Sequence, residues 1–216
     1  MFPLTILTMR IEKIEQSKHK QERILVYLEG GDLLRITGDT LLRFGLQAGM
    51  DLLPETVVQL KNEQHHYEVR SRGAHMASSR MLSKKELTER LQRRGASTEE
   101  AEETADWLED LGAVDDAAYA AAVVRHYGHM GYGALRVKQE LQRRGIRRDL
   151  WDGAMEQLPD AQECIEALLH KKCKGNKPTA EEGRKLSAML QRRGFTWQEI
   201  RPVLSRFLDG AELPEE

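Results

Sequence analysis

The pentapeptide Leu-Gln-Arg-Arg-Gly occurs three times in this chain of 216 residues, at positions 91–95, 141–145 and 190–194. The copies begin 50 and 49 residues apart (141 − 91 and 190 − 141), and such even spacing is typical of tandem structural repeats. A glycine at the end of a helix commonly takes the left-handed conformation that stops it, and the residue after that glycine packs back on the residue five positions earlier. Each copy therefore predicts a helix that ends at the motif glycine.

Apolar residues on both sides of the motif predict two packed helices in each copy. Before the motif, Leu87, Val137 and Leu186 lie four residues ahead of the motif leucine and extend one buried stripe. After it, apolar residues recur six, ten and thirteen positions beyond the glycine: Ala101, Ala105 and Leu108, then Trp151, Met155 and Leu158, then Ile200, Leu204 and Phe207.

Helix-start signals support the second helix of each copy. Ser97 with Glu100, and Thr196 with Glu199, have the spacing of a capping box. In the middle copy Asp149 is the expected cap.

A further helix is expected before each pair, at about 67–79, 116–126 and 161–172. Additional helix-start signals are Ser83, Asp115 or Asp116, and Thr179 with Glu182. The expected fold is mainly α, with three tandem three-helix, helix-turn-helix-like repeats in an elongated curved array. The predicted limits are 67–114, 115–160 and 161–216, the last including a short acidic tail.

Residues 1–66 are predicted to form a separate β-containing module. Two β-type runs, 24–28 and 33–37, flank Glu-Gly-Gly-Asp and predict a hairpin, because glycine supplies the positive φ that such a turn requires. A run at 9–14 is a candidate third strand. Asp39 or Thr40 is the expected cap of a short helix through Phe44, and Pro54 suits the first turn of another.

The order of these segments resembles the RecX family of recombinase regulators. Residues 74–95, with Ser83 and Leu87, are similar to the family's opening repeat. Residues 114–120 and 133–146 are similar to its most characteristic segment, and residues 190–195 to its third repeat. The resemblance covers nearly the whole chain when the hairpin module is taken as the variable N-terminal part.

The resemblance implies a non-enzymatic regulator that binds the RecA recombinase filament on single-stranded DNA. Such a protein modulates, and mostly inhibits, the ATPase, strand exchange and filament growth of the recombinase, in homologous recombination, DNA repair and the SOS response. The expected partners are the RecA filament and the single-stranded DNA within it, with at most weak direct DNA binding. No catalytic residue, metal or cofactor is expected, and we expect a monomer.

The net charge of −2 conceals a strongly divided chain. Residues 98–116 hold nine acidic side chains and no basic one. Residues 133–148 hold six basic side chains against Glu140 alone, and residues 170–194 hold eight Lys or Arg against two Glu. A near-neutral total therefore does not exclude an anionic partner.

The paired arginines of the repeat are the first candidates for contact with such a partner. A row of guanidinium groups suits carboxylates on successive protomers of a helical polymer, or DNA phosphates within it. Basic residues in a last helical turn also favour the helix dipole by ~0.3–1 kcal/mol, which is a purely structural explanation for the same pattern. The candidate partner-binding residues are Arg143, Arg144, Arg147, Arg148, Arg136, Lys138, Arg93, Arg94, Arg192 and Arg193.

Two other functions fit parts of the pattern. Three-helix units with basic helices also suit a helix-turn-helix transcription regulator that enters the major groove, although the mild acidity of the chain argues against it. An adaptor that binds only protein is the third hypothesis.

Other kinds of site and location have little support in the sequence. Cys164, His170 and Cys173 lack the second ligand pair of a zinc site. The longest apolar run, 117–124, is far shorter than the roughly 20 residues of a membrane-spanning helix, so no membrane span is expected. The first nine residues lack the pattern of a secretory signal, and two cysteines cannot staple a secreted framework of this size, so we expect a cytoplasmic chain.

Overall fold

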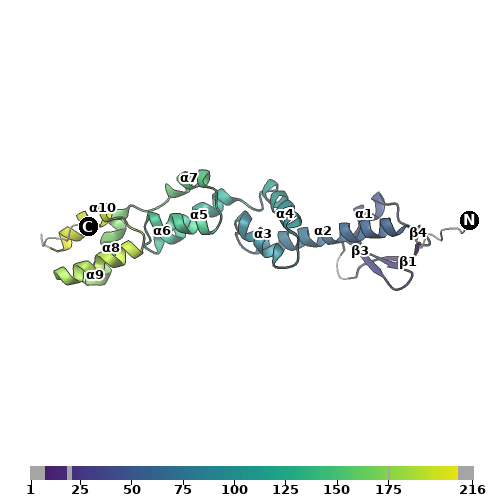
Figure 1. Cartoon of the computed structure of the whole chain (residues 1–216), viewed down its shortest axis with the longest axis horizontal. Coiled ribbons are helices and arrows are strands. Elements are labelled where there is room, and N and C mark those ends of the chain that lie inside the picture. Colours follow the sequence, from purple (N-terminus) through teal and green to yellow (C-terminus); the bar gives the residue numbers. More distant parts are fainter. Residues whose placement is uncertain (1–7, 19–20, 175, 209–216) are drawn as a thin grey trace, which may run out of the picture.

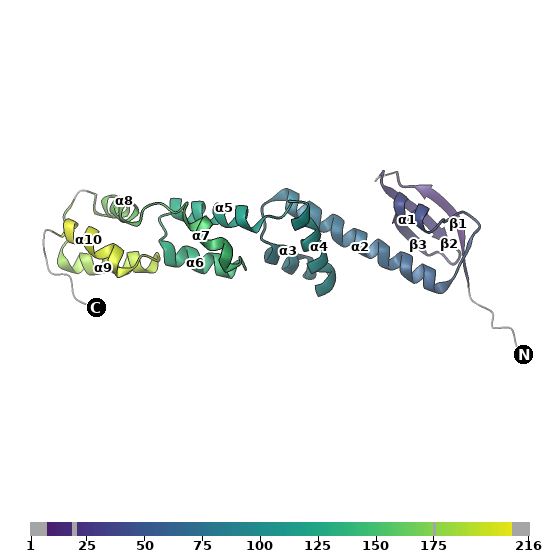
Figure 2. The same ribbon diagram turned by 90° about the horizontal axis from the view of Figure 1, so that it is seen from above.

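The computed structural model describes residues 8–18, 21–174 and 176–208, and the predicted acidic tail lies outside them. The described chain is strongly elongated. A small sheet lies near the N-terminal end, and groups of helices follow it in sequence order along one long axis (Figures 1 and 2). The mainly helical architecture with an N-terminal hairpin module is confirmed.

The N-terminal module is an antiparallel sheet in the order β3-β2-β1-β4. Strands β1 (Met9–Gln16), β2 (Arg23–Leu28) and β3 (Leu33–Thr37) agree with the predicted hairpin and third strand. Gly30 and Gly31 have φ of +93° and +89°, as the turn between β2 and β3 requires. The two-residue strand β4 (Asp51–Leu52) was not predicted, because it is too short to show an alternating pattern.

Two helices leave the sheet, and both differ from expectation. Helix α1 (Gly38–Arg43) is capped by Thr37, whose hydroxyl accepts a hydrogen bond from the Thr40 backbone, so the prediction of Asp39 or Thr40 was wrong. Helix α2 (Pro54–Ser79) begins at Pro54 as predicted but continues without a break into the first repeat. Leu60, in the first half of α2, belongs to the hydrophobic core of the sheet. Val69, in the second half, belongs to the core of the first repeat.

The remaining helices follow the repeat. The first repeat adds α3 (Lys84–Gln92) and α4 (Thr98–Asp110) to the end of α2. The second contains α5 (Asp116–His129), α6 (Ala134–Arg143), a 3-10 turn η1 (Arg148–Leu150) and the short α7 (Trp151–Met155). The third contains α8 (Ala161–Cys173), α9 (Ala180–Arg192) and α10 (Trp197–Phe207).

Most predicted helix caps are confirmed. The Ser97, Thr179 and Thr196 capping boxes are complete, and Ser83 and Asp115 cap α3 and α5. The Asp149 prediction was wrong, because this residue lies inside the 3-10 turn and α7 has no side-chain cap.

Each repeated motif ends its helix in the predicted manner. The motif glycines Gly95, Gly145 and Gly194 have φ of +91°, +72° and +89°. The residue after each glycine donates its backbone N–H to the carbonyl of the motif leucine, at 3.1, 3.1 and 3.2 Å. Both residues of each such pair are buried, so the helix stop is also part of the core.

Among the described residues, four separate hydrophobic clusters follow one another in sequence order. They span residues 11–60, 69–114, 119–154 and 165–208. We propose, in accord with these clusters, that the chain divides into units 1–66, 67–114, 115–160 and 161–216; the first limit falls inside α2. The three repeats are called units 1, 2 and 3 below.

Candidate partner-binding surface

In the second motif, the side chain of the second arginine, Arg144, points inward and holds unit 2 against unit 1. Such an arginine contact between two units is called a clasp below. The Arg144 side chain is only 20% exposed. Its Nη1 donates to the Tyr119 hydroxyl at 2.6 Å and lies 3.4 Å from Glu86 Oε1, while the Tyr119 hydroxyl donates to Glu86 Oε2 at 2.9 Å. Burial, reinforced by the hydrogen bond to Glu86, raises the pKa of Tyr119. Since Glu86 lies on α3, Arg144 connects units 1 and 2.

Two further hydrogen bonds close the same junction. The fully buried Ser83 hydroxyl donates to the Arg144 carbonyl at 2.7 Å. The Lys84 backbone N–H donates to Asp116 Oδ1 at 2.8 Å. Burial raises the pKa of Asp116, and the Lys84 hydrogen bond opposes that rise. The junction thus uses residues more than thirty positions apart, which fixes the relative orientation of the two units.

The third motif makes an analogous clasp onto unit 2. Arg193 Nη1 donates to the carbonyls of Met130 and Gly131 at 2.9 and 3.1 Å, and its guanidinium lies 5.3 Å from the centre of the Tyr132 ring. The backbone joins as well, because the Gly133 N–H donates to the Arg193 carbonyl at 2.9 Å.

In the first motif the equivalent Arg94 is exposed, and it has no repeat before it. Its carbonyl accepts a hydrogen bond from Arg72 Nη1 at 2.9 Å, and its side chain makes no hydrogen bond or ion pair within the described residues. The three arginine pairs therefore do not form a uniform outward row.

The carboxylate of Glu140, in unit 2, interacts with three of the candidate arginines. Its side chain is 6% exposed, and Arg143 donates to Oε2 through Nε and Nη2 at 3.0 and 2.9 Å. Arg136 lies 3.4 Å from Oε1, and Arg144 Nε lies 3.7 Å from Oε2. Burial opposes ionisation of Glu140, but the hydrogen bonds and charges of Arg143 and Arg144 outweigh it and lower the pKa of Glu140.

We expect Glu140→Gln to lose stability in a pH-dependent way. A carboxyl whose folded-state pKa is lowered stabilises the fold above its unfolded pKa, and that stability disappears as the pH falls through the folded value. In urea unfolding, the variant should be less stable than wild type at neutral pH and approach it at about pH 3. A difference that is the same at both values would contradict the role of the charge.

The remaining candidate cations point outward. Arg143 and Arg147 are mostly exposed despite their pairs with Glu140 and Asp149. Arg148 is exposed and lies over the Trp151 ring, with 5.8 Å to its centre. Arg93 is paired with Glu89 at 3.6 Å. Lys138 and Arg192 are exposed and have no ion pair within the described part of the chain.

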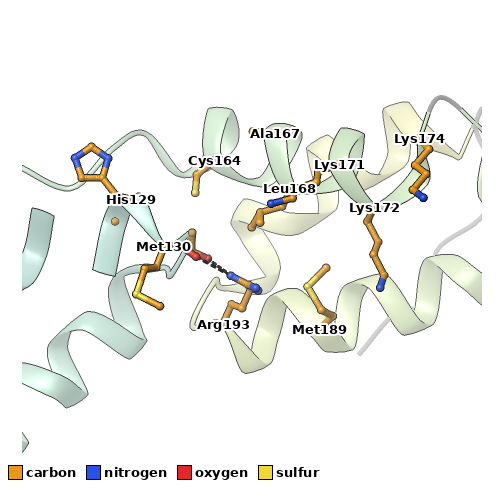
Figure 3. Close-up of a pocket in the computed structure, with 12 residues that line it drawn as sticks. His129, Met130, Cys164, Ala167, Leu168, Lys171, Lys172, Lys174, Met189 and Arg193 are labelled. Carbon is orange, nitrogen blue, oxygen red and sulfur yellow. Dashed lines mark hydrogen bonds between the residues drawn. The ribbon is translucent and has the colours of Figure 1, made fainter. Parts of the chain in front are cut away.

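Unit 3 contains a basic groove whose lysines were not among the predicted partner-binding residues. A cavity of about 860 Å³ lies between α8 and α9, lined by Leu168 and Met189 and by the cations Lys171, Lys172 and Arg193 (Figure 3). Lys174 and the Met130–Gly131 turn of unit 2 complete it. A second hollow shares Lys172 and Met189 and extends the groove toward Lys185. The signal was present in the sequence, because residues 164, 168, 171 and 172 follow helical spacing on one face of α8.

Among the described residues, no three His, Cys, Asp or Glu side chains come together as a metal site. The ring of His170, one of the three residues considered for zinc, packs against Phe207 at a centroid distance of 4.9 Å. Within the same residues, no helix combines the length and the apolar character needed to cross a membrane.

The fold and this surface define the class of protein: tandem three-helix repeats that are joined by arginine contacts between neighbouring units and that expose basic side chains. The sequence comparisons then identify the family. Residues 115–155 and 160–204 match models described as the second and third three-helix domains of RecX. A regulatory protein RecX from Pseudomonas tolaasii is 31% identical over 149 residues, covering 68% of this chain and 94% of its own. One from Bacillus pumilus is 27% identical over 212 residues, covering 95% and 80%. The chain belongs to the RecX family.

Solved structures show the same fold. A crystal structure of regulatory protein RecX superimposes with a TM-score of 0.75 at 24% identity and covers 90% of this chain and 98% of its own. A RecX structure from Lactobacillus salivarius gives 0.57 at 22% identity, covering 66% and 98%. At these identities the likeness concerns the fold alone.

Proposed function

We propose that this protein is a non-enzymatic, cytoplasmic regulator that binds the RecA recombinase filament on single-stranded DNA. It modulates, mostly by inhibition, the ATPase, strand exchange and filament growth of the recombinase in recombination and DNA repair. Membership of a family whose relatives are named regulatory proteins supports the regulatory part. The filament and its DNA are the proposed partners.

One structural observation carries the choice of a polymeric partner. The side chains of Arg144 and Arg193 hold the three repeats in a single elongated row (Figure 1). The exposed cations of successive units therefore keep fixed separations. A polymer offers equivalent acidic or phosphate groups at regular intervals, and a preorganised row binds several of them without a further ordering cost. A chain that bridges neighbouring protomers in this way blocks subunit exchange or filament growth.

The test uses outward cations, because Arg144 and Arg193 also hold the fold together. We expect Lys138→Glu with Arg148→Glu to raise the amount needed to inhibit the recombinase ATPase on single-stranded DNA by about tenfold, a loss of about 1.4 kcal/mol. Arg201→Glu with Arg206→Glu is the matched control, since both arginines are exposed on α10 and unpaired within the described chain. The control should inhibit like wild type.

Two results would contradict the proposal at different levels. Unchanged inhibition by the Lys138 and Arg148 variant would remove these cations from the interface but leave filament regulation standing. Absence of inhibition by wild type, together with tight sequence-selective binding of duplex DNA in a gel shift, would instead support the helix-turn-helix transcription regulator.

A further inference from the structure

Helix α4 of unit 1 carries an acidic stripe along its exposed face. Ala101, Thr104, Ala105 and Leu108 face the core. The opposite face follows helical spacing and consists of Glu99, Glu102, Glu103, Asp106 and Asp110. Asp106 is paired with Lys84, whereas the other four are exposed and have no ion pair within the described residues. The stripe ends at Leu111, a large apolar side chain that is 62% exposed. The surface therefore combines carboxylates with an apolar end.

The groove of unit 3 has the complementary chemistry. Lys171, Lys172 and Lys174 form a basic rim, and no acidic side chain lines the larger cavity among the described residues. Its floor contains Leu168 and Met189, and α8 and α9 are both held against α10 rather than closely against each other. Aliphatic and thioether groups adapt readily to an incoming apolar side chain. Among the described residues that line this cavity there is no Phe, Tyr or Trp, and His129 carries its one aromatic ring, whereas strands of nucleic acid usually stack successive bases on several such rings.

The two surfaces also match in length. The stripe from Glu99 to Asp110 covers eleven residue steps of α4, or about 17 Å at 1.5 Å per residue. The groove wall from Cys164 to Lys174 covers ten residue steps of α8, or about 15 Å. Within one chain they cannot meet, because unit 2 lies between them along the long axis (Figures 1 and 2).

We propose that the unit 3 groove binds the acidic stripe of α4 from a second copy of this chain, in a head-to-tail contact. Carboxylates of Glu102 and Glu103 lie on the lysine rim, and Leu111 supplies the apolar anchor. The contact joins two different surfaces, so each added copy leaves a free groove at one end and a free stripe at the other. The product is an open row of copies, in place of the monomer expected from the sequence. This assembly goes beyond the proposed function and does not require the recombinase.

Sedimentation velocity of the full-length chain tests the assembly. At about 0.1 M salt the weight-average mass should rise across about a hundredfold increase in protein concentration. At about 1 M salt it should remain that of a monomer, because the screening length falls from about 10 to about 3 Å. A wild-type chain that stays monomeric at the lower salt overturns the proposal, and binding of labelled oligothymidylate to the groove would then assign it to nucleic acid.

Charge reversal identifies the two surfaces. Lys171→Glu with Lys172→Glu should lower the association constant at least about tenfold, and so should Glu102→Lys with Glu103→Lys. An equimolar mixture of the two variants should assemble again, because every contact between unlike copies regains opposite charges. The Arg201 and Arg206 control described above should assemble like wild type, and circular dichroism checks helix content. Failure of the mixture to assemble overturns the proposal even if both single variants are monomeric.

Discussion

Gly194→Ala is expected to destabilise the protein by about 3 kcal/mol, because two separate costs add. The backbone of Gly194 has φ of +89°, which an L side chain rarely adopts. A Cβ at this position would lie 2.4 Å from the Arg136 backbone nitrogen and 2.6 Å from the Arg136 Cβ. Backbone atoms cannot move aside as the end of a flexible side chain can, so the junction between units 2 and 3 must shift.

The first motif provides a matched control for this substitution. Gly95 has nearly the same φ, +91°, but a Cβ there would meet nothing within 4 Å. Gly95→Ala should therefore show only the conformational cost, about 1 kcal/mol. Urea unfolding followed by circular dichroism measures both variants. Equal losses would show that the close approach of Gly194 to Arg136 contributes no stability.

Arg144→Leu has the second large effect, an expected loss of about 2–3 kcal/mol. The substitution removes the hydrogen bonds to Tyr119 and Glu86 and leaves Glu86 with one partner fewer at the junction. The equivalent residue of the first motif, Arg94, is exposed, and its side chain makes no hydrogen bond or ion pair with the part of the chain that the structure describes, so Arg94→Leu should change stability little.

Amide hydrogen exchange distinguishes local opening of the junction between units 1 and 2 from destabilisation of the whole protein. The Lys84 amide is protected by Asp116 across the junction, so its exchange should accelerate in Arg144→Leu while amides in the middle of α9 keep their protection. Uniform acceleration along the chain, or no acceleration at Lys84, would contradict the assignment of Arg144 as the clasp between units 1 and 2.

Local stereochemistry explains why the helix ends could be predicted from the sequence. Glycine at a left-handed position and Ser or Thr three residues before Glu act within one turn of the chain, so Gly95, Ser97 and Thr196 reveal their roles without knowledge of the fold. The continuity of α2 was missed because the two apolar patterns on it belong to different cores. No proline follows Pro54 in this stretch, and Gly73 lies within the helix, where it packs closely against Thr104 and Leu108 of α4.

The functional surface was harder to predict, because the two arginines of each motif have different roles. Arg193 turns inward to carbonyls of Met130 and Gly131, which lie about sixty residues earlier. No local pattern distinguishes it from Arg192 next to it. Glu140 was counted as a single opposing charge, whereas it contacts three arginines. These roles depend on distant contacts, and a single sequence does not encode them as a spacing.

Helix α2 joins the N-terminal sheet and the first repeat through one continuous, rigid element. Its 26 residues correspond to about 39 Å of continuous helix, anchored in a different hydrophobic core at each end. A helix held in this way transmits rotation as well as distance. The distance and the rotation between the sheet core and the core of the first repeat are therefore set by one rigid element, and a residue inserted into or deleted from α2 would change both by about 1.5 Å and about 100°.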